Sequence, residues 1–476
     1  MIKSININIK ELVKSKLFIF SIALIVMSFT IPLRFVFVGD VDSAERSLYL
    51  SEIYRNNSIW LFDNFFVVLL VVIVLFALVD IILRRRIKVV GMKKKNIAVA
   101  MLIPLLFTSI YLNAYTVRTT GGERSKPIVN KVFIITFDGT RADVFWNSDH
   151  WITQHKEEGV WAEKFSCTYP TVTYPNHISI VTGTWPQIHR CELNPAYEKE
   201  RRHLIFRAYR KPVVEDIFEI AEEYGIVTAL FMAPQTLAAI MGGPDTYRGG
   251  YGSSLENMNE AIEFINLHKE EIESRGLLIF IHLVDSDDIM HEYSTDSDEY
   301  RHAIEKQGDL VGELIENITA LGWADDSLVI VTADHGAIGY AHFNRFPSMV
   351  CDVPFWAWGG PIRNGSAIKG GRLIDIAVTV AFALGIPKPR KAVGVVLYRI
   401  FMEDILRDVK GITDLEGTIV SEYKKSIHRA YFECVKYILG FSIMLILVSI
   451  TIYDVIRLRR ILRSMADLGE SKSRNT

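Results

Sequence analysis

The sequence predicts an α/β domain, with a mostly parallel sheet covered by helices on both faces, together with four transmembrane helices. Short runs rich in β-branched and aromatic residues are typical of strands buried on both faces of a sheet. These runs are Lys131–Phe137, Val227–Met232, Leu277–Leu283 and Ser327–Thr332. Segments with helical periodicity alternate with them: Val213–Tyr224, Glu260–Ser274 and Glu299–Leu321. This alternation favours parallel strands joined by helices.

Bulk composition narrows the class of protein. A chain of 476 residues can hold one large domain, or two, in addition to membrane segments. The formal net charge of -2 and the isoelectric point near 6.7 give no basic signature for nucleic acid, so no nucleic-acid binding is expected. The mean hydropathy of +0.20 is high for a soluble enzyme and indicates segments that lie in lipid.

Four long apolar segments predict membrane helices. They cover about Leu17–Val38, Trp60–Leu83, Ile97–Tyr115 and Tyr437–Ile456. Each could alternatively be a buried core helix, but basic residues flank them in a consistent pattern. The loop 84–95 and the tail 457–476 are basic, and by the positive-inside rule both face the cytoplasm. Residues 117–433 are therefore expected on the opposite side of the membrane.

The predicted organisation follows from these spans. Residues 1–116 hold three transmembrane helices, 117–130 a linker, 131–400 the lumenal catalytic domain, 401–433 a connector, 434–456 the last transmembrane helix and 457–476 the cytoplasmic tail. Glycosylation sequons at Asn56, Asn317 and Asn364 fit a lumenal glycoprotein. Four cysteines show no C-x-x-C spacing, which disfavours a cysteine zinc site. A disulfide between Cys167 and Cys191 stays open.

Acidic and histidine side chains follow three of the predicted strands, where ligands bind in open α/β sheets. These residues are Asp138, then Asp287 and His291, then Asp334 and His335, with His342 seven residues further on. A single Asp after a strand is commonly a helix cap. Three such strand ends, two of them with a nearby His, indicate a site for two catalytic zinc ions instead.

A hydroxyl-rich stretch, residues 166–194, supplies a candidate nucleophile. Its P-T-V-T-Y-P-N-H and following I-V-T-G resemble the nucleophile motif of the nucleotide pyrophosphatase/phosphodiesterase branch of the alkaline phosphatase superfamily. The resemblance implies an alkaline-phosphatase-like fold, Thr173 as the nucleophile and Asn194, 21 residues later, as the phosphate-contacting Asn. Thr171 as the nucleophile, and Asn194 as a plain turn residue, remain alternatives.

The resemblance also implies the ligand sets of the two divalent metal ions, expected to be Zn²⁺. One zinc would be held by Asp287, His291 and His342, and the other by Asp138, Thr173, Asp334 and His335. A His shortly after Asp-His-Gly is similar to the glycosylphosphatidylinositol (GPI) ethanolamine phosphate transferases. Residues 353–360 and 375–394 resemble the member of that branch that modifies the first mannose.

The expected function is transfer of phosphoethanolamine from phosphatidylethanolamine, through a covalent Thr173 intermediate, to a mannose of a GPI precursor. The expected partners are a phospholipid donor and a glycolipid acceptor, and the expected location is the endoplasmic reticulum membrane with the catalytic domain lumenal. One alternative is a membrane-anchored type I phosphodiesterase that hydrolyses phosphodiesters. A second is a non-catalytic membrane protein with a decayed site.

Overall fold

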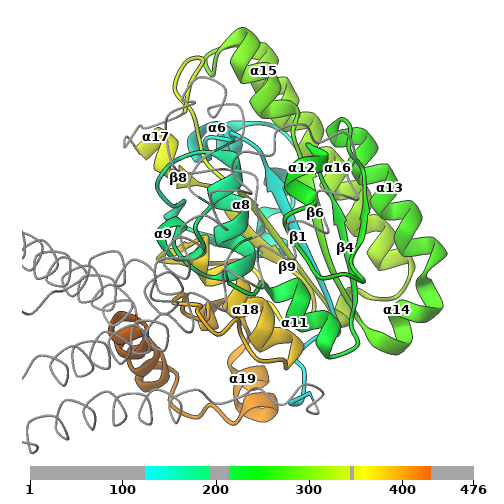
Figure 1. Ribbon diagram of the computed structural model, residues 1–476, viewed down its shortest axis with the longest axis vertical. Helices are drawn as coiled ribbons and strands as arrows, with labels where there is room; N and C mark the ends of the chain where they lie inside the picture. Colours follow the sequence, from blue (N-terminus) through cyan, green and yellow to red (C-terminus); the bar gives the residue numbers. More distant parts are fainter. Residues whose placement is uncertain (1–123, 192–193, 195–211, 213, 343–347, 430–476) are drawn as a thin grey trace, which may run out of the picture. The chain divides into compact units, whose positions relative to one another are not determined.

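The computed structural model describes residues 124–191, 194, 212, 214–342 and 348–429 (Figure 1). The four predicted transmembrane helices lie outside these residues. Within the described part, every helix is too short or too polar to cross a lipid bilayer. The chain divides into two units at Thr413–Asp414. Residues 415–429 of the second unit are helical, and the first unit contains both sheets and all the candidate site residues.

An eight-stranded mixed sheet forms the centre of the first unit, with strand order β10-β2-β9-β7-β1-β6-β4-β5. The strands are β1 Lys131–Phe137, β2 Val160–Ala162, β4 Val227–Phe231, β5 Tyr247–Gly249, β6 Leu277–Leu283, β7 Ser327–Ala333, β9 Phe355–Trp358 and β10 Ser366–Ile368. Every residue of β1, β6 and β7 is buried. Continuous apolar strands of this kind require helices on both faces of the sheet.

The prediction of a mostly parallel sheet is confirmed for the four predicted strands. Strand β1 pairs in parallel with β6 and β7, and β4 pairs in parallel with β6. One strand departs from the pattern, because β9 runs antiparallel to both β7 and β2 and makes the sheet mixed. A second sheet has three short strands: β3 Phe165–Ser166, β8 Asp352–Val353 and β11 Gly371–Arg372.

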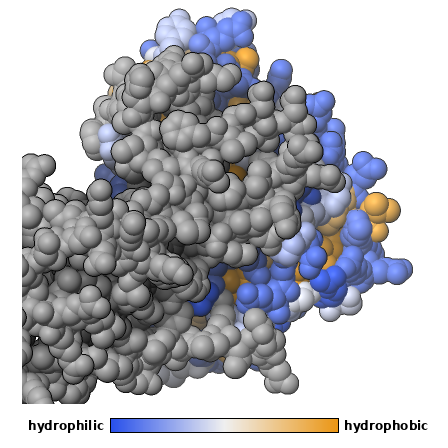
Figure 2. Space-filling view, in the orientation of Figure 1, coloured by the Kyte–Doolittle hydropathy of each residue, from blue (hydrophilic) through white to orange (hydrophobic). Residues whose placement is uncertain are grey.

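Helices cover both faces of the large sheet. One layer contains α13, α14 and α16, and the other contains α8, α11 and α18 (Figure 1). The α-helices of the first unit are α6 Ala142–Asn147, α7 Trp151–Gln154, α8 Thr173–Thr182, α9 Pro186–His189, α11 Ile217–Glu223, α12 Gln235–Ala238, α13 Ser254–Leu267, α14 Lys269–Arg275, α15 Asp285–Tyr293, α16 Asp298–Ala320, α17 Ser348–Cys351, α18 Ile374–Leu384 and α19 Glu403–Lys410. Short 3₁₀ turns lie at Lys156–Glu158, Ala324–Asp326 and Tyr398–Ile400. The surface over α13 and α14 is largely hydrophilic, with scattered apolar residues (Figure 2).

Helix boundaries differ from the sequence prediction where side chains cap the helices. The predicted helix at 260–274 is two helices: α13 starts earlier, at Ser254, and the helix is interrupted at His268, after which α14 begins. Ser253 accepts from the backbone N–H of Glu256, and Glu256 reaches back to Ser253, in a capping box. A second capping box, between Asp216 and Glu219, starts α11 at Ile217, inside the predicted 213–224.

Candidate active site

Thr173 is the first residue of α8, at the end of the sheet where the predicted metal ligands lie. The preceding residue, Val172, is extended, so the chain turns into the helix at Thr173 itself. The Thr173 side chain is buried, and its Oγ1 lies 3.5 Å from Nε2 of His335. A hydroxyl at a helix N-terminus sits where unpaired backbone N–H groups favour an anion. The position therefore suits a nucleophile for a phosphoryl group.

Asn194 lies beside Thr173 as the sequence predicts. Its Oδ1 accepts a hydrogen bond of 2.9 Å from the backbone N–H of Tyr174. Its Nδ2 then faces Thr173 and donates to Oγ1 at 3.4 Å. The backbone contact orients the amide, so that the N–H₂ group rather than the carbonyl points at the hydroxyl. A phosphoryl oxygen next to Thr173 would meet this same donor.

The alternative nucleophile, Thr171, is engaged elsewhere. Its Oγ1 donates to the backbone carbonyl of His342 at 2.6 Å, and its own carbonyl accepts from Nδ1 of His342 at 2.7 Å. The hydroxyl proton is thus committed to a buried carbonyl. Of the two threonines, the geometry favours Thr173 as the nucleophile and gives Thr171 the task of holding His342.

Three carboxylates converge because of the sheet register. Phe137 at the end of β1 lies beside both Ala333 of β7 and Leu283 of β6. The residues that follow, Asp138 and Asp334, therefore emerge side by side at the carboxyl edge of the sheet, and α15 brings Asp287 to them. The backbone N–H of Gly139 donates to Asp334 Oδ1 at 3.1 Å and joins the two strand ends.

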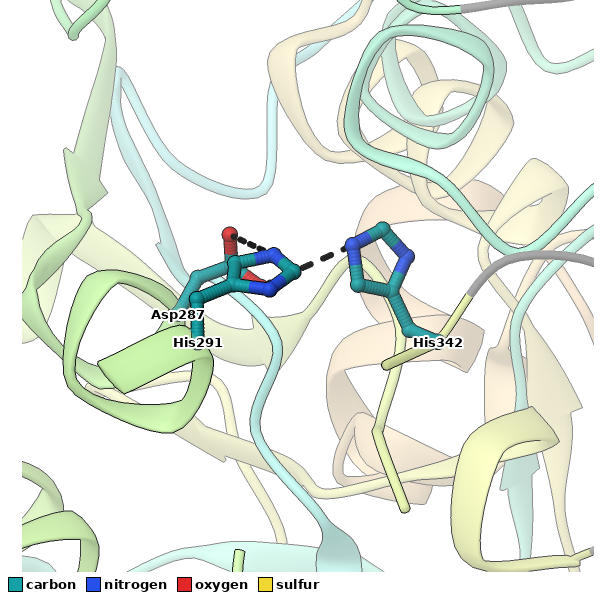
Figure 3. Close-up of side chains that lie close together, drawn as sticks. All are labelled: Asp287, His291 and His342. Carbon is teal, nitrogen blue, oxygen red and sulfur yellow. Dashed lines mark ion pairs between the residues drawn. The ribbon is translucent and has the colours of Figure 1, made fainter. Parts of the chain in front are cut away.

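The three predicted histidine ligands point their Nε2 atoms at these carboxylates. His335 Nε2 is 3.2 Å from Asp334 Oδ2 and 3.6 Å from Asp138 Oδ1. His291 Nε2 is 3.4 Å from Asp287 Oδ2, and His342 Nε2 is 3.9 Å from Asp287 Oδ1. Figure 3 shows His291 approaching Asp287 from α15 and His342 from the opposite side, in a separate segment. The rings of His335 and His342 stack with centroids 4.0 Å apart.

The residues form two groups that fit metal ions. In each group the ligand atoms lie within 4.8 Å of one another. The groups are Asp287, His291 and His342, and Asp138, Asp287 and His335. The first matches one predicted ligand set. The second shares two residues with the other predicted set, and Asp334 and Thr173 both adjoin its His335.

A separate observation shows that a cation fits here. Three buried carboxylate oxygens have no hydrogen-bond partner: Asp138 Oδ1, Asp287 Oδ1 and Asp334 Oδ2. Leaving a buried acceptor of this kind unsatisfied costs at least about 1–3 kcal/mol, and more when it is charged. All three lie against the histidine Nε2 atoms just described. Oxygen and imidazole donors around one point match the preference of Zn²⁺.

The electrostatics agree with a site shaped for cations. Burial raises the pKa of Asp138 well above its usual range, and the charges of Asp334 and Asp287 raise it further. Burial and the charge of Asp287 raise the pKa of Asp334 to about 8. Burial, reinforced by His342, lowers the pKa of His335 well below its usual range. A bound cation would relieve the repulsion among the carboxylates, and the neutral imidazole leaves a lone pair to coordinate it.

Two buried histidines that the sequence analysis did not single out support the ligands. His282, within β6, places Nδ1 2.7 Å from the carbonyl of Ala233 and Nε2 2.9 Å from Asp138 Oδ2. His177, within α8, places Nδ1 2.9 Å from the carbonyl of Thr173 and 3.5 Å from Asp334 Oδ2. A polar residue inside the otherwise apolar run of β6 was the available signal for His282. His177 is the last residue of the quoted P-T-V-T-Y-P-N-H.

Contacts also account for residues outside the predicted ligand sets. Asp285 is tied to the start of α13, because its side chain accepts from the backbone N–H of Ser254 at 2.9 Å. The disulfide between Cys167 and Cys191, which the sequence left undecided, is not formed. Cys167, Cys191 and Cys351 are all reduced, and Cys167 pairs with the segment of Cys351 instead of that of Cys191.

Comparison with known proteins finds a family that matches the part of the chain that contains the site. Residues 132–349 match the family model of type I phosphodiesterase/nucleotide pyrophosphatase. These residues form a type I phosphodiesterase/nucleotide pyrophosphatase domain. The phosphodiesterase domain places the chain's α/β fold in the alkaline phosphatase superfamily, and it holds every predicted site residue. The superfamily uses divalent metals, with which the Asp/His clusters are compatible.

Similar proteins carry related descriptions. Human bis(5′-adenosyl)-triphosphatase ENPP4 is 26% identical over 238 residues, which cover 45% of this chain and 49% of that protein. Human ectonucleotide pyrophosphatase/phosphodiesterase family member 1 is 28% identical over 195 residues, covering 39% of this chain and 21% of that protein. The chain spans about half the length of its ENPP4 relatives. The solved structure of murine ENPP5 has a TM-score of 0.44 at 16% identity and covers 54% of this chain and 96% of that one.

Proposed function

We propose that the phosphodiesterase domain hydrolyses phosphodiester bonds, with Thr173 as the nucleophile. The observation that carries this proposal is the surroundings of Thr173 Oγ1, which lies 3.5 Å from His335 Nε2 and 3.4 Å from Asn194 Nδ2. The same hydroxyl stands at the N-terminus of α8, beside buried carboxylates that lack partners. A threonine that served only to form a turn would not need an imidazole, an amide donor and unpartnered carboxylates around its hydroxyl.

Two divalent ions would be held by the side chains that converge here. The first would take Asp287, His291 and His342, and the second Asp138, Asp334 and His335, next to Thr173. When bound, such ions lower the pKa of a coordinated hydroxyl and neutralise charge on phosphoryl oxygens. Zn²⁺ is the ion that this mixture of carboxylate and imidazole donors suits.

The chain's own residues then account for both chemical steps. Thr173 Oγ1 loses its proton and forms a bond to phosphorus, while the bond from phosphorus to the leaving oxygen breaks and that oxygen takes up a proton as the free alcohol. Water then gives up a proton and attacks the phosphorus of the Thr173 ester, which still carries the second ester group, and the released Thr173 oxygen regains a proton. In both steps the Asn194 amide donates to a non-bridging oxygen, and one well-placed donor of this kind is worth roughly 3–4 kcal/mol. His177 and His282 hold Thr173, Asp334 and Asp138 in place.

The relatives favour a hydrolase over the transferase expected from the sequence. The matched family is named for phosphodiesterases and nucleotide pyrophosphatases, and so are the similar human proteins. The proposed substrate class is therefore a phosphodiester or phosphoanhydride of a nucleotide. Phosphoethanolamine transfer to a GPI mannose is retained as an outcome of the test. The apolar spans and basic flanks support a multi-pass membrane protein with its catalytic domain on the side opposite the cytoplasm. The endoplasmic reticulum remains the proposed membrane because of the resemblance to the GPI transferases.

The test uses the full-length protein loaded with Zn²⁺. A chromogenic nitrophenyl ester of thymidine monophosphate should be hydrolysed, and Thr173→Ala should lower kcat/KM by roughly 10³-fold or more, because the nucleophile is lost. Thr173→Ser should retain part of the activity. Thr418→Ala removes a threonine hydroxyl on the surface, where it bonds only the Asp414 carbonyl, and serves as the control.

A parallel assay offers phosphatidylethanolamine labelled in its head group, with and without a GPI mannolipid. Label released as free phosphoethanolamine, or no reaction alongside nucleotide-ester hydrolysis, supports the hydrolase. Label recovered on the mannolipid replaces the hydrolase with the transferase. Hydrolysis that survives Thr173→Ala overturns the nucleophile under either reaction.

A further inference from the structure

Cys167 and Cys351 lie opposite each other at the end of a short antiparallel ladder. Strands β3 and β8 pair Phe165 with Val353 and Ser166 with Asp352. The next position in this register pairs Cys167 with Cys351, and the backbone N–H of Cys167 donates to the Cys351 carbonyl at 2.9 Å. Directly opposed residues in such a ladder have Cα atoms roughly 4.5–5.5 Å apart, which is within the span of a disulfide.

The Cys167 side chain also reaches the segment of Cys351. Its Sγ donates to the backbone carbonyl of Val350, the residue before Cys351, at 3.6 Å, and the two thiols influence each other's pKa. Both cysteines are reduced in this structure. Cys191, the other cysteine that the structure describes, is buried elsewhere, and its backbone N–H donates to Nδ1 of His189.

We propose that Cys167 and Cys351 form an intramolecular disulfide that clips the strand leading to Thr173 onto the segment that follows His342. The clip would covalently reinforce a connection that the protein already makes through Thr171 and His342. It does not depend on the identity of the substrate, so it extends beyond the proposed function.

The two cysteines differ in the way that thiol–disulfide exchange requires. Cys351 is half-buried, and the neighbouring Cys167 thiol lowers its pKa to about 7, with Lys164 helping against burial and Asp352. Cys167 has the opposite shift, because the neighbouring Cys351 thiol and burial raise its pKa well above the usual range. Cys351 is therefore the thiolate that attacks first.

The oxidant is a second disulfide, such as glutathione disulfide or the disulfide of an oxidoreductase. The Cys351 thiolate attacks one sulfur of it, forms a mixed disulfide and expels one thiolate. The Cys167 thiolate then attacks the Cys351 sulfur and expels the second. The two protein thiols lose two protons and two electrons in total, and the oxidant leaves as two thiols.

The clip closes a long loop that contains most of the catalytic residues. Residues 167–351 include Thr173, Asp287, Asp334 and His342. In the chain-entropy description, a longer closed loop constrains the unfolded chain more strongly. We therefore expect oxidation to raise the Tm of the domain by roughly 5 °C or more.

The experiment equilibrates the full-length protein in glutathione redox buffers, alkylates the remaining thiols and digests without reduction. Mass spectrometry should find the Cys167 and Cys351 peptides linked, at a mass lower by two hydrogen atoms than their sum. Cys191→Ser is the matched control and should keep the link. Cys351→Ser should lose it, together with the rise in Tm on oxidation.

Three results would overturn the proposal. The first is recovery of Cys167 and Cys351 both alkylated from the oxidising buffer. The second is a link between Cys167 and Cys191, and the third is Cys351 carrying glutathione alone. Because the wild-type chain is read directly by mass, a variant that misfolds does not affect the outcome. The proposed function is unaffected by any of the three.

Discussion

In each predicted histidine ligand, Nδ1 forms a hydrogen bond with a backbone carbonyl. His291 bonds Tyr340 at 3.1 Å, His335 bonds Gly336 at 3.1 Å and His342 bonds Thr171 at 2.7 Å. A carbonyl only accepts, so in the neutral form of each ring the proton sits on Nδ1. The lone pair is left on Nε2, which is the atom that faces the carboxylates. Backbone partners of this kind orient a ring and select its tautomer before metal arrives.

The contact of Thr171 with His342 predicts that Thr171 positions this candidate metal ligand. Thr171→Val removes the hydroxyl that donates to the His342 carbonyl, whereas Thr171→Ser keeps it. We expect Thr171→Val to weaken Zn²⁺ binding by roughly 10–100-fold, as loss of a supporting contact around a metal ligand does. Competition with a chelator measures this affinity. Equal affinities for the Val and Ser variants would show that the hydroxyl has no positioning role.

The turn between β1 and α6 brings two elements into close contact. Gly139 follows Asp138 with φ +62, a conformation that favours glycine, and its N–H reaches Asp334. A Cβ placed on Gly139 would lie 2.5 Å from Oδ1 of Asp287 in α15. The strand end and the helix can therefore approach this closely only because the residue between them has no side chain.

Gly139→Ala should accordingly impair the site more than the fold. We expect a decrease in kcat/KM of at least about 10-fold, because displacing a catalytic group by about 1 Å can cost 10²-fold. Gly322→Ala is the control, since Gly322 also has a positive φ, +73, but nothing within 4 Å of the added Cβ. Metal content and activity are measured for both variants. Similar losses in the two would assign the effect to backbone strain instead of to Asp287.

At the scale of the whole molecule, separate elements of the fold bring three carboxylates that repel one another to one site. Asp138 follows β1, Asp334 follows β7 and Asp287 belongs to α15 after β6. Without a cation the folded protein keeps a proton on Asp334, whose pKa is raised to about 8, and on Asp138, whose pKa burial raises well above its usual range. Against the effect of burial, the neighbouring histidines instead lower the pKa of Asp287. The unfolded chain would release the protons of Asp334 and Asp138 at about pH 4.

This difference predicts how the metal-free protein responds to pH. Between about pH 7 and pH 8 the folded state binds more protons than the unfolded state, so the free energy of unfolding falls as pH rises. Histidines with a lowered pKa, such as His335, are still about one-quarter protonated in the unfolded chain at pH 7. They oppose the trend in part at that end of the window and are neutral in both states by pH 8. We expect the Tm of chelated protein to be lower at pH 8 than at pH 7.

Zn²⁺ should offset the loss of stability of the metal-free protein at pH 8. Because the metal competes with the protons, its stabilising shift in Tm should be larger at pH 8 than at pH 7. The Asp334→Asn variant removes one of the titrating carboxylates and should show a flatter Tm profile when chelated. A chelated wild-type Tm that is constant or rises over this window would contradict the buried-carboxylate account.

The strands and the candidate ligand residues could be predicted from the sequence for a physical reason. Strands β1 and β6 have the predicted bounds, because parallel strands buried on both faces must be continuously apolar. The polar residues that follow them stand out against this background, so Asp138, Asp287 and Asp334 could be picked out without coordinates. The helix starts at Ser254 and Ile217 were missed because they depend on capping contacts, which periodicity does not report.

What the sequence determined by itself is the α/β class, the strand ends that carry acids and histidines, and the motif that contains Thr173. Local patterns encode these features, since burial and turn chemistry act over a few residues. Only the tertiary structure decided the antiparallel β9, the commitment of the Thr171 hydroxyl to the His342 carbonyl, the contacts of His177 and His282, and the backbone pairing of Cys167 with Cys351. Each of these depends on which distant segments meet, and that is set by strand order and register.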